Sequence, residues 1–148
     1  MSVTLFMETT RIAPERTVQE IQSVLARYGA GAVLLDYTAG QVAAVSFKYM
    51  VADREIAFRL PCRWENLAQV LKDSGRRPRS DDTLEAWARR VAWRQILRWV
   101  EAQFAMVETG MVKVQEVFLP YAQTKGGATV FESLEKTHFK MLAYDAHE

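Results

Sequence analysis

The spacing of apolar side chains predicts a helix over residues 14–28. Pro14 suits the first turn of a helix and Gly29 suits the position just after its end. Between them the apolar residues recur every three or four positions: Val18, Ile21, Val24, Leu25 and Tyr28. This period is typical of an amphipathic helix with one buried face. Before it, the segment 2–9 reads as a strand.

The next thirty residues predict a three-stranded meander. An apolar, β-branched run over 32–37 ends in the turn sequence 38–41, and apolar residues then alternate with other residues over 42–51. Two such runs joined by a short turn are typical of a β-hairpin. Alternation resumes over 55–60 and stops at Pro61, since proline lacks the N–H that a central strand needs.

The segment 81–108 predicts the longest helix, because it contains neither glycine nor proline. Ser80 or Asp81 is expected to cap its start, and Gly110 to end it. At 100° per residue one broad arc is apolar: Trp93, Ile96, Leu97, Val100, Phe104 and Val107. A helix with so wide an apolar arc is buried either in the core of one chain or in a homodimer interface.

Shorter elements complete the chain. We expect a helix over 63–72, a polar loop over 73–80, a short helix over 129–136 and a tail over 139–148. Residues 111–121 fit both a strand and a helix. Their aromatic cluster ends at Tyr121, and it suits the core or, if exposed, a partner. The order β-α-β-β-β-α-α predicts one α+β domain over 1–148, with a mostly antiparallel sheet covered by helices.

Composition narrows the setting of the protein. Its 148 residues are 49% hydrophobic and 25% charged, as in globular proteins, and no apolar run reaches the ~20 residues of a membrane span. Glu8 and Arg11 interrupt the start where a signal peptide needs an apolar stretch. The single cysteine, Cys62, forms no internal disulfide. We therefore expect a protein that stays in the cytoplasm of the cell that makes it and makes no membrane contact.

Positive charge is concentrated in one part of the chain and lies among tryptophans. Residues 54–98 carry 11 basic and 6 acidic side chains, whereas the segments before and after them are net negative. The candidate residues lie in the polar loop and on the polar stripe of the long helix: Arg76, Arg77, Arg79, Trp87, Arg90, Arg94 and Arg98. Guanidinium groups bind phosphates and an indole stacks on bases, so the pattern favours nucleic acid, single-stranded DNA above all. Alternatively, the stripe is only a solvated face, with Glu101 relieving Arg98.

Catalytic and metal chemistry has little support in the sequence. His138 and His147 have no cysteine or carboxylate at metal-ligand spacing, so no zinc site can be assembled. Asp53 and Glu55 flank a strand turn, but Ala57 stands where a metal-dependent nuclease would carry its lysine. We therefore expect a non-enzymatic protein without a cofactor.

Four segments, MSVTLFMETTRIAPERT, FRLPCRW, RVAWRQILRWVEAQ and EVFLPYAQ, resemble small uncharacterised proteins encoded by bacteriophages and integrated elements. No activity is attached to that family, so the resemblance concerns genomic context. It implies a protein that handles single-stranded DNA or one that acts on a host factor. Our first interpretation is a phage-derived nucleic-acid-binding protein. The alternative is an inhibitor or adaptor that binds a host or phage protein, with a homodimer formed through the apolar arc.

Overall fold

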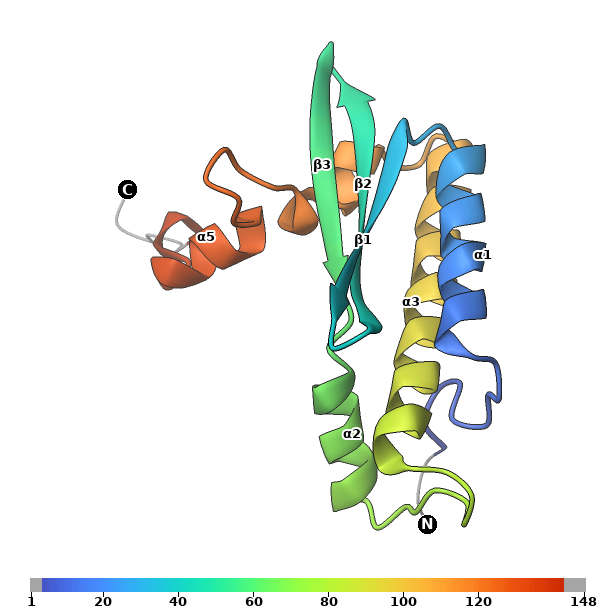
Figure 1. The fold of residues 1–148 in the computed structure, drawn as a ribbon. Coiled ribbons are helices and arrows are strands. Elements are labelled where there is room, and N and C mark those ends of the chain that lie inside the picture. Colours follow the sequence, from blue (N-terminus) through green and yellow to red (C-terminus); the bar gives the residue numbers. More distant parts are fainter. Residues whose placement is uncertain (1–3, 143–148) are drawn as a thin grey trace.

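The computed structural model describes residues 4–142, which fold into an α+β arrangement of one antiparallel sheet and flanking helices. Their elements run in the order α1 (Pro14–Arg27), β1 (Ala32–Thr38), β2 (Gln41–Val51), β3 (Arg54–Pro61), α2 (Trp64–Asp73), α3 (Leu84–Glu108), α4 (Val114–Val117), η1 (Leu119–Tyr121), α5 (Val130–Lys136) and η2 (Lys140–Leu142). Helices α1 and α3 lie side by side along the sheet, and α2 packs against the first turns of α3 (Figure 1). The predicted fold class is confirmed.

The sheet is the meander that the alternating pattern predicts, in the order β1-β2-β3. Its strands pair antiparallel, with Val33 opposite Phe47 and Phe47 opposite Phe58. The β1–β2 turn places Ala39 and Gly40 at φ values of 50° and 79°, a pair of left-handed residues that gives a tight hairpin. The central strand buries four consecutive residues, from Ala44 to Phe47, because both of its faces are covered there.

The core forms where α3 crosses the sheet. Trp93, Leu97, Val100 and Phe104 are at most 1% exposed. The ring of Phe104 lies 5.0 Å from that of Tyr28 and 5.3 Å from that of Phe118. Packing within one chain therefore buries most of the apolar arc, with Ile96 and Val107 half-buried at its sides. Of the two expected environments, the structure shows the core of one chain for Trp93, Leu97, Val100 and Phe104.

The predicted strand over 2–9 is wrong for the residues that the structure describes, and Ser2 and Val3 lie outside them. Residues 6–9 form turns, with Glu8 N–H donating to the Leu5 carbonyl at 2.9 Å. The local alternation was misleading because this segment has no strand beside it. It crosses α3 as an arm, and we call residues 4–13 the N-terminal arm.

Helix α3 begins at Leu84, three residues later than predicted. The cap is Thr83, whose Oγ1 accepts a hydrogen bond from the Ala86 N–H at 3.0 Å, so the prediction of Ser80 or Asp81 is wrong. Asp82 instead accepts from the Thr83 N–H and faces Arg90. The side chain that reaches the first free N–H of the helix defines its start.

Beyond α3 the ambiguous segment resolves into the short helices α4 and η1. The chain then runs along β3, where Gln123 N–H donates to the Ala57 carbonyl at 2.8 Å. Helix α5 follows, capped by Thr129. The first part of the expected tail turns through η2, and residues 143–148 lie outside the described part. No helix between residues 4 and 142 has both the length and the apolar composition that crossing a membrane requires.

Candidate functional site

Arg94, at the centre of the predicted stripe, is buried. Its side chain is 5% exposed, and Nη1 bonds to the Glu20 carboxylate of α1 at 2.5 Å and to Thr17 Oγ1 at 3.4 Å. Its Nε has no hydrogen-bond partner among the described residues. A guanidinium in this position ties α3 to α1 and is not available to a phosphate.

The other two arginines of the stripe also have partners within the chain. Arg90 makes two hydrogen bonds to Asp82, and these hold the pKa of that carboxyl below its ordinary value. Arg98 is 43% exposed and bonds to Glu101 at 2.6 Å, as expected. The prediction of an exposed stripe is therefore wrong for Arg90 and Arg94, whose partner carboxylates lie outside the stripe, whereas Arg98 is exposed as predicted.

Trp87 and Arg76 hold the N-terminal arm. The indole Nε1 of Trp87 donates to the Glu8 carbonyl at 2.9 Å, and Arg76 Nε lies 2.8 Å from the Glu8 carboxylate. Two turns along α3, Gln95 Nε2 donates to the Phe6 carbonyl at 2.9 Å. The arm is thus fixed across α3 by side chains that satisfy its backbone, in place of strand pairing.

A small basic hollow lies beside this arm. Arg11, Arg77 and Arg79 line it with Trp87 and Arg90, around a volume of about 190 Å³. The carboxylates of Glu8 and Asp82 also line it, and they form ion pairs with Arg76 and Arg90. Arg11, Arg77 and Arg79 are exposed, and none forms an ion pair with any residue between 4 and 142. We call these three arginines with Trp87 the basic corner.

The basic corner brings together only part of the predicted surface. The hollow beside the arm is lined by four of the predicted residues, Arg77, Arg79, Trp87 and Arg90. Arg94 and Arg98 lie on later turns of α3. Arg11 was missed by sequence reasoning. It is an isolated charge in a net negative segment, so no local signal marked it.

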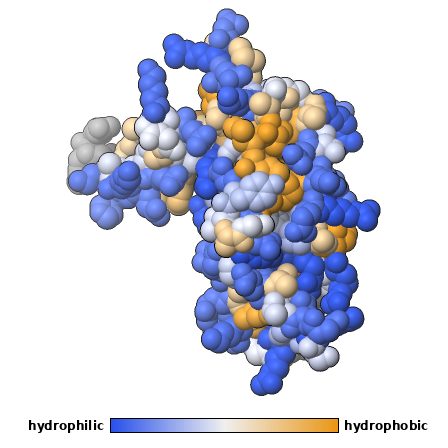
Figure 2. Space-filling view, viewed as in Figure 1, coloured by the Kyte–Doolittle hydropathy of each residue, from blue (hydrophilic) through white to orange (hydrophobic). Residues whose placement is uncertain are grey.

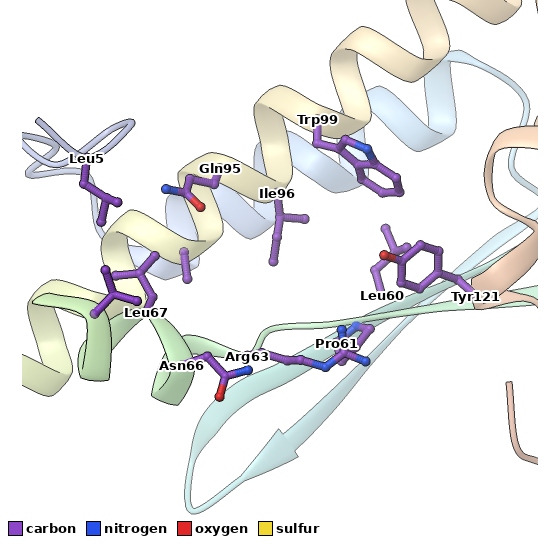
Figure 3. Close-up of a pocket in the computed structure, with 12 residues that line it drawn as sticks. Leu5, Leu60, Pro61, Arg63, Asn66, Leu67, Gln95, Ile96, Trp99 and Tyr121 are labelled. Carbon is purple, nitrogen blue, oxygen red and sulfur yellow. The ribbon is translucent and has the colours of Figure 1, made fainter. Parts of the chain in front are cut away.

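A larger hollow, of about 570 Å³, opens between α2, α3 and the end of β3. Figure 3 shows Ile96 and Trp99 pointing from α3 across the space toward Leu60 and Tyr121. Leu67 and Val70 of α2 line it, and Leu5 of the arm closes one end. We call this hollow the α2–α3 groove.

The groove lies between two contacts that α3 makes along its length. Helix α2 packs against the first turns of α3, Tyr121 of η1 meets Trp99 on a later turn, and the hollow opens between these contacts. The ring of Trp99 meets Tyr121 edge-on at 5.6 Å and Phe118 at 5.2 Å. Trp99 and Tyr121 therefore form one continuous aromatic wall of the groove.

The polar side chains that border the apolar lining are one basic group and two amides. Arg63, Asn66 and Gln95 lie at the groove, and none of the described residues that line it is acidic. Arg63 is exposed and makes no ion pair within the described range. Its neighbour Cys62 is 7% exposed, and burial raises the pKa of that thiol to about 12, so it is not a nucleophile at neutral pH.

Sequence reasoning did not place a site here, although it recognised the aromatic cluster that ends at Tyr121. The cluster divides, because Phe118 is fully buried while Tyr121 is half-exposed at the groove. The partners of Tyr121 in the groove come from α2, α3 and the arm. Only the tertiary fold brings them together.

Neither hollow has the ligands of a metal centre. Among residues 4–142, no three His, Cys, Asp or Glu side chains are grouped so that they could hold a metal ion.

No protein-family model matches the sequence, and no curated protein or solved structure is detectably similar to it. The resemblance to phage-encoded proteins stays a prediction.

Proposed function

We propose that this protein is a non-enzymatic binding protein whose α2–α3 groove receives an apolar segment of a partner protein. The observation that carries the proposal is the groove itself, an unfilled space of about 570 Å³ with mostly apolar walls. Concave apolar sites with a few polar groups are the usual form of binding sites. Val70 is 50% exposed at its rim, so a partner would remove apolar surface from water.

The lining also indicates what kind of segment fits. Tryptophan and tyrosine side chains dominate the energetics of many interfaces, and Trp99 and Tyr121 are presented together. A volume of this size takes two or three large apolar side chains. Arg63 supplies a cation at the edge, and none of the described residues that line the groove is acidic. The expected partner segment therefore carries aliphatic or aromatic residues with an aspartate or glutamate beside them.

Selection from a random peptide library on the immobilised full-length protein tests this proposal. We expect the selected peptides to share an apolar pair flanked by an acid, and to shift the indole N–H signal of Trp99 in heteronuclear NMR. Val70→Glu and Arg63→Glu should each weaken their binding at least about tenfold, which corresponds to 1.4 kcal/mol.

Met50→Glu is the matched control, because Met50 is 61% exposed on the sheet, away from the groove. Its binding should equal that of the wild type. Peptides that bind both groove variants as tightly as the wild type would overturn the proposal, as would a selection that yields no binder.

A second candidate function rests on the basic corner. Three guanidinium groups without ion pairs in the described chain converge beside the indole of Trp87. Such a group suits phosphate contact, with stacking on the ring. This narrows the predicted nucleic-acid surface to Arg77, Arg79 and Trp87, with Arg11 added, and single-stranded DNA remains the favoured ligand.

Fluorescence anisotropy with single- and double-stranded DNA and RNA at two salt concentrations tests the second candidate. Changing Arg11, Arg77 and Arg79 to Gln should weaken binding and flatten the salt dependence by roughly one unit per lost phosphate contact. The same change at Arg54, Lys113 and Lys125, which are exposed elsewhere, is the charge-matched control. A wild-type protein without affinity for any of the four nucleic acids at about 50 mM salt would exclude this function.

A further inference from the structure

We propose that β1 pairs with β1 of a second copy of this chain, in antiparallel orientation, to form a six-stranded sheet across a two-fold axis. The two edges of the three-stranded sheet differ. Along β3 the chain itself covers the edge, because Ala122 bridges Phe58 and Gln123 bonds to Ala57. No strand between residues 4 and 142 pairs with the outer edge of β1.

Strand β1 lacks the features that protect an edge. Its seven residues, Ala32–Thr38, include no lysine, arginine or proline, which are the residues that usually discourage edge-to-edge pairing. The irregularity in its pairing with β2 leaves Ala43 of β2 without a partner, so β1 itself carries no bulge. Between residues 4 and 142, no backbone group bonds to the outer side of β1, so this side can accept another strand.

The side chains of β1 favour burial. Leu34 is 53% exposed and Tyr37 is 63% exposed. In Figure 2 a strip of hydrophobic residues lies over the position of β1 in Figure 1. The single charge of the strand, Asp36, is 3.1 Å from Arg59 and is neutralised within its own sheet. A second strand of the same sequence would thus meet apolar surface without a repelling charge.

A second copy of this chain fits the surroundings of β1, because little like charge is brought together there. Two-fold pairing of a strand with itself is necessarily antiparallel and closes at two copies. The flank of α1 that lines the hollow beside β1 presents Gln19 and Gln22, with Glu15 as its only charge. An axis near Leu35 places the two Glu15 side chains at opposite ends of the interface, and Tyr37 opposite Val33 of the second copy.

The expected dimer is concentration-dependent. One pair of seven-residue strands with flanking side chains is small beside the 1,200–2,000 Å² or so that stable interfaces bury. Sedimentation velocity from low to high micromolar concentration should therefore show a monomer converting to a dimer. Hydrogen exchange should show protection that rises with concentration and is confined to residues 32–38.

Edge variants separate this interface from others. Leu34→Lys with Tyr37→Lys should shift the dissociation constant at least about tenfold toward monomer, because lysines at an edge oppose pairing. Met50→Lys is the control, since Met50 is similarly exposed but belongs to the central strand. Val70→Glu, the groove variant, should leave the dimer unchanged, so failure here is distinguishable from failure of the groove proposal.

Three results would overturn self-pairing. The wild-type protein could stay monomeric at all concentrations. It could form a dimer that persists when Leu34 and Tyr37 are lysine. Residues 32–38 could also become protected only when a groove-binding peptide is added, which would assign the edge to that peptide.

Discussion

The two halves of α3 are held to the rest of the molecule in different ways. The first half, from Leu84 to Gln95, uses charged and polar side chains that reach distant segments: Arg90 to Asp82, Arg94 to Glu20, and Trp87 and Gln95 to the N-terminal arm. The second half, from Ile96 to Glu108, uses ring packing around Phe104 and Trp99. Directional contacts thus dominate in the first half, which also buries Val91 and Trp93, and ring packing dominates in the second, where Glu108 also accepts a hydrogen bond from Tyr28.

This difference has an energetic meaning. Ring packing removes apolar area from water and so stabilises the fold by a large amount, but it tolerates similar shapes. A buried ion pair gives back much of its Coulomb energy in lost hydration, yet removing one partner is costly. The first half of α3 therefore fixes which segments lie against it, and the second half supplies more of the stability.

Truncation of Phe104 should have the largest effect and is the first test of the contrast. Phe104→Ala should lower the free energy of unfolding by about 3–5 kcal/mol, because the ring is fully buried among other rings. Urea denaturation followed by circular dichroism measures it. Met111→Ala, at a residue 66% exposed, should change stability by no more than about 0.5 kcal/mol. A loss below about 1 kcal/mol for Phe104→Ala would contradict the assignment of stability to this half.

Removal of Glu20 should have the second-largest effect on stability. It tests the directional half of α3, because the two partners of the Arg94–Glu20 ion pair differ in exposure. Glu20→Ala leaves the buried guanidinium of Arg94 without its anion and should cost about 2–4 kcal/mol. Arg94→Met leaves only Glu20, which is 37% exposed and also lies near Arg16, so it should cost about 1 kcal/mol. Equal costs for the two changes would show that the pair is not desolvated as the structure has it.

Loss of the cap tests where the first half begins. Thr83→Ala should cost about 1 kcal/mol, since it removes the acceptor for the Ala86 N–H. Ser80→Ala and Asp81→Ala should be close to neutral, although the sequence favoured those positions. Thermal denaturation of the three variants ranks them, and a larger loss at Ser80 or Asp81 would move the helix start.

The smallest effect concerns pH and again belongs to the first half. Hydrogen bonds from Arg90 lower the pKa of Asp82, so this carboxylate stabilises the fold above its ordinary pKa. The stabilisation is lost as pH falls through the lower value of the folded state, that is, below about pH 4. Wild type and Asp82→Asn should differ in stability at pH 7 and converge below that range. A difference that does not decrease as pH falls below about 4 would mean that the carboxylate charge is not its source.

Local patterns predicted the elements well. The hairpin, the third strand and α2 appear within about one residue of their expected bounds, because alternation and helical spacing are properties of consecutive residues. The strand expected over 2–9 failed because a strand exists only beside another. The element beside this segment is instead α3, whose side chains bond to the arm. The alternation of Leu5 and Met7 carries no information about which element lies beside them.

The candidate sites could be predicted only in part, and for a physical reason. Charge and spacing identified Arg94, but its carboxylate partner lies 74 residues earlier in the chain. The sequence similarly marked Trp99 and Tyr121 as aromatic without showing that they face one space. Whether a charge is free or paired, and whether a ring is covered, depends on contacts between distant segments. Arg77 and Arg79 kept their predicted exposure because their loop meets fewer such segments.

The N-terminal arm has a consequence for regulation. Leu5 forms one end of the α2–α3 groove, and Glu8 to Arg11 form one side of the basic corner, so both hollows share a wall. Thermodynamic linkage requires that a ligand which displaces this shared wall at one hollow also alter affinity at the other, by the same factor in both directions. Two ligands bound on opposite sides of the ten-residue arm would then change each other's affinity without direct contact.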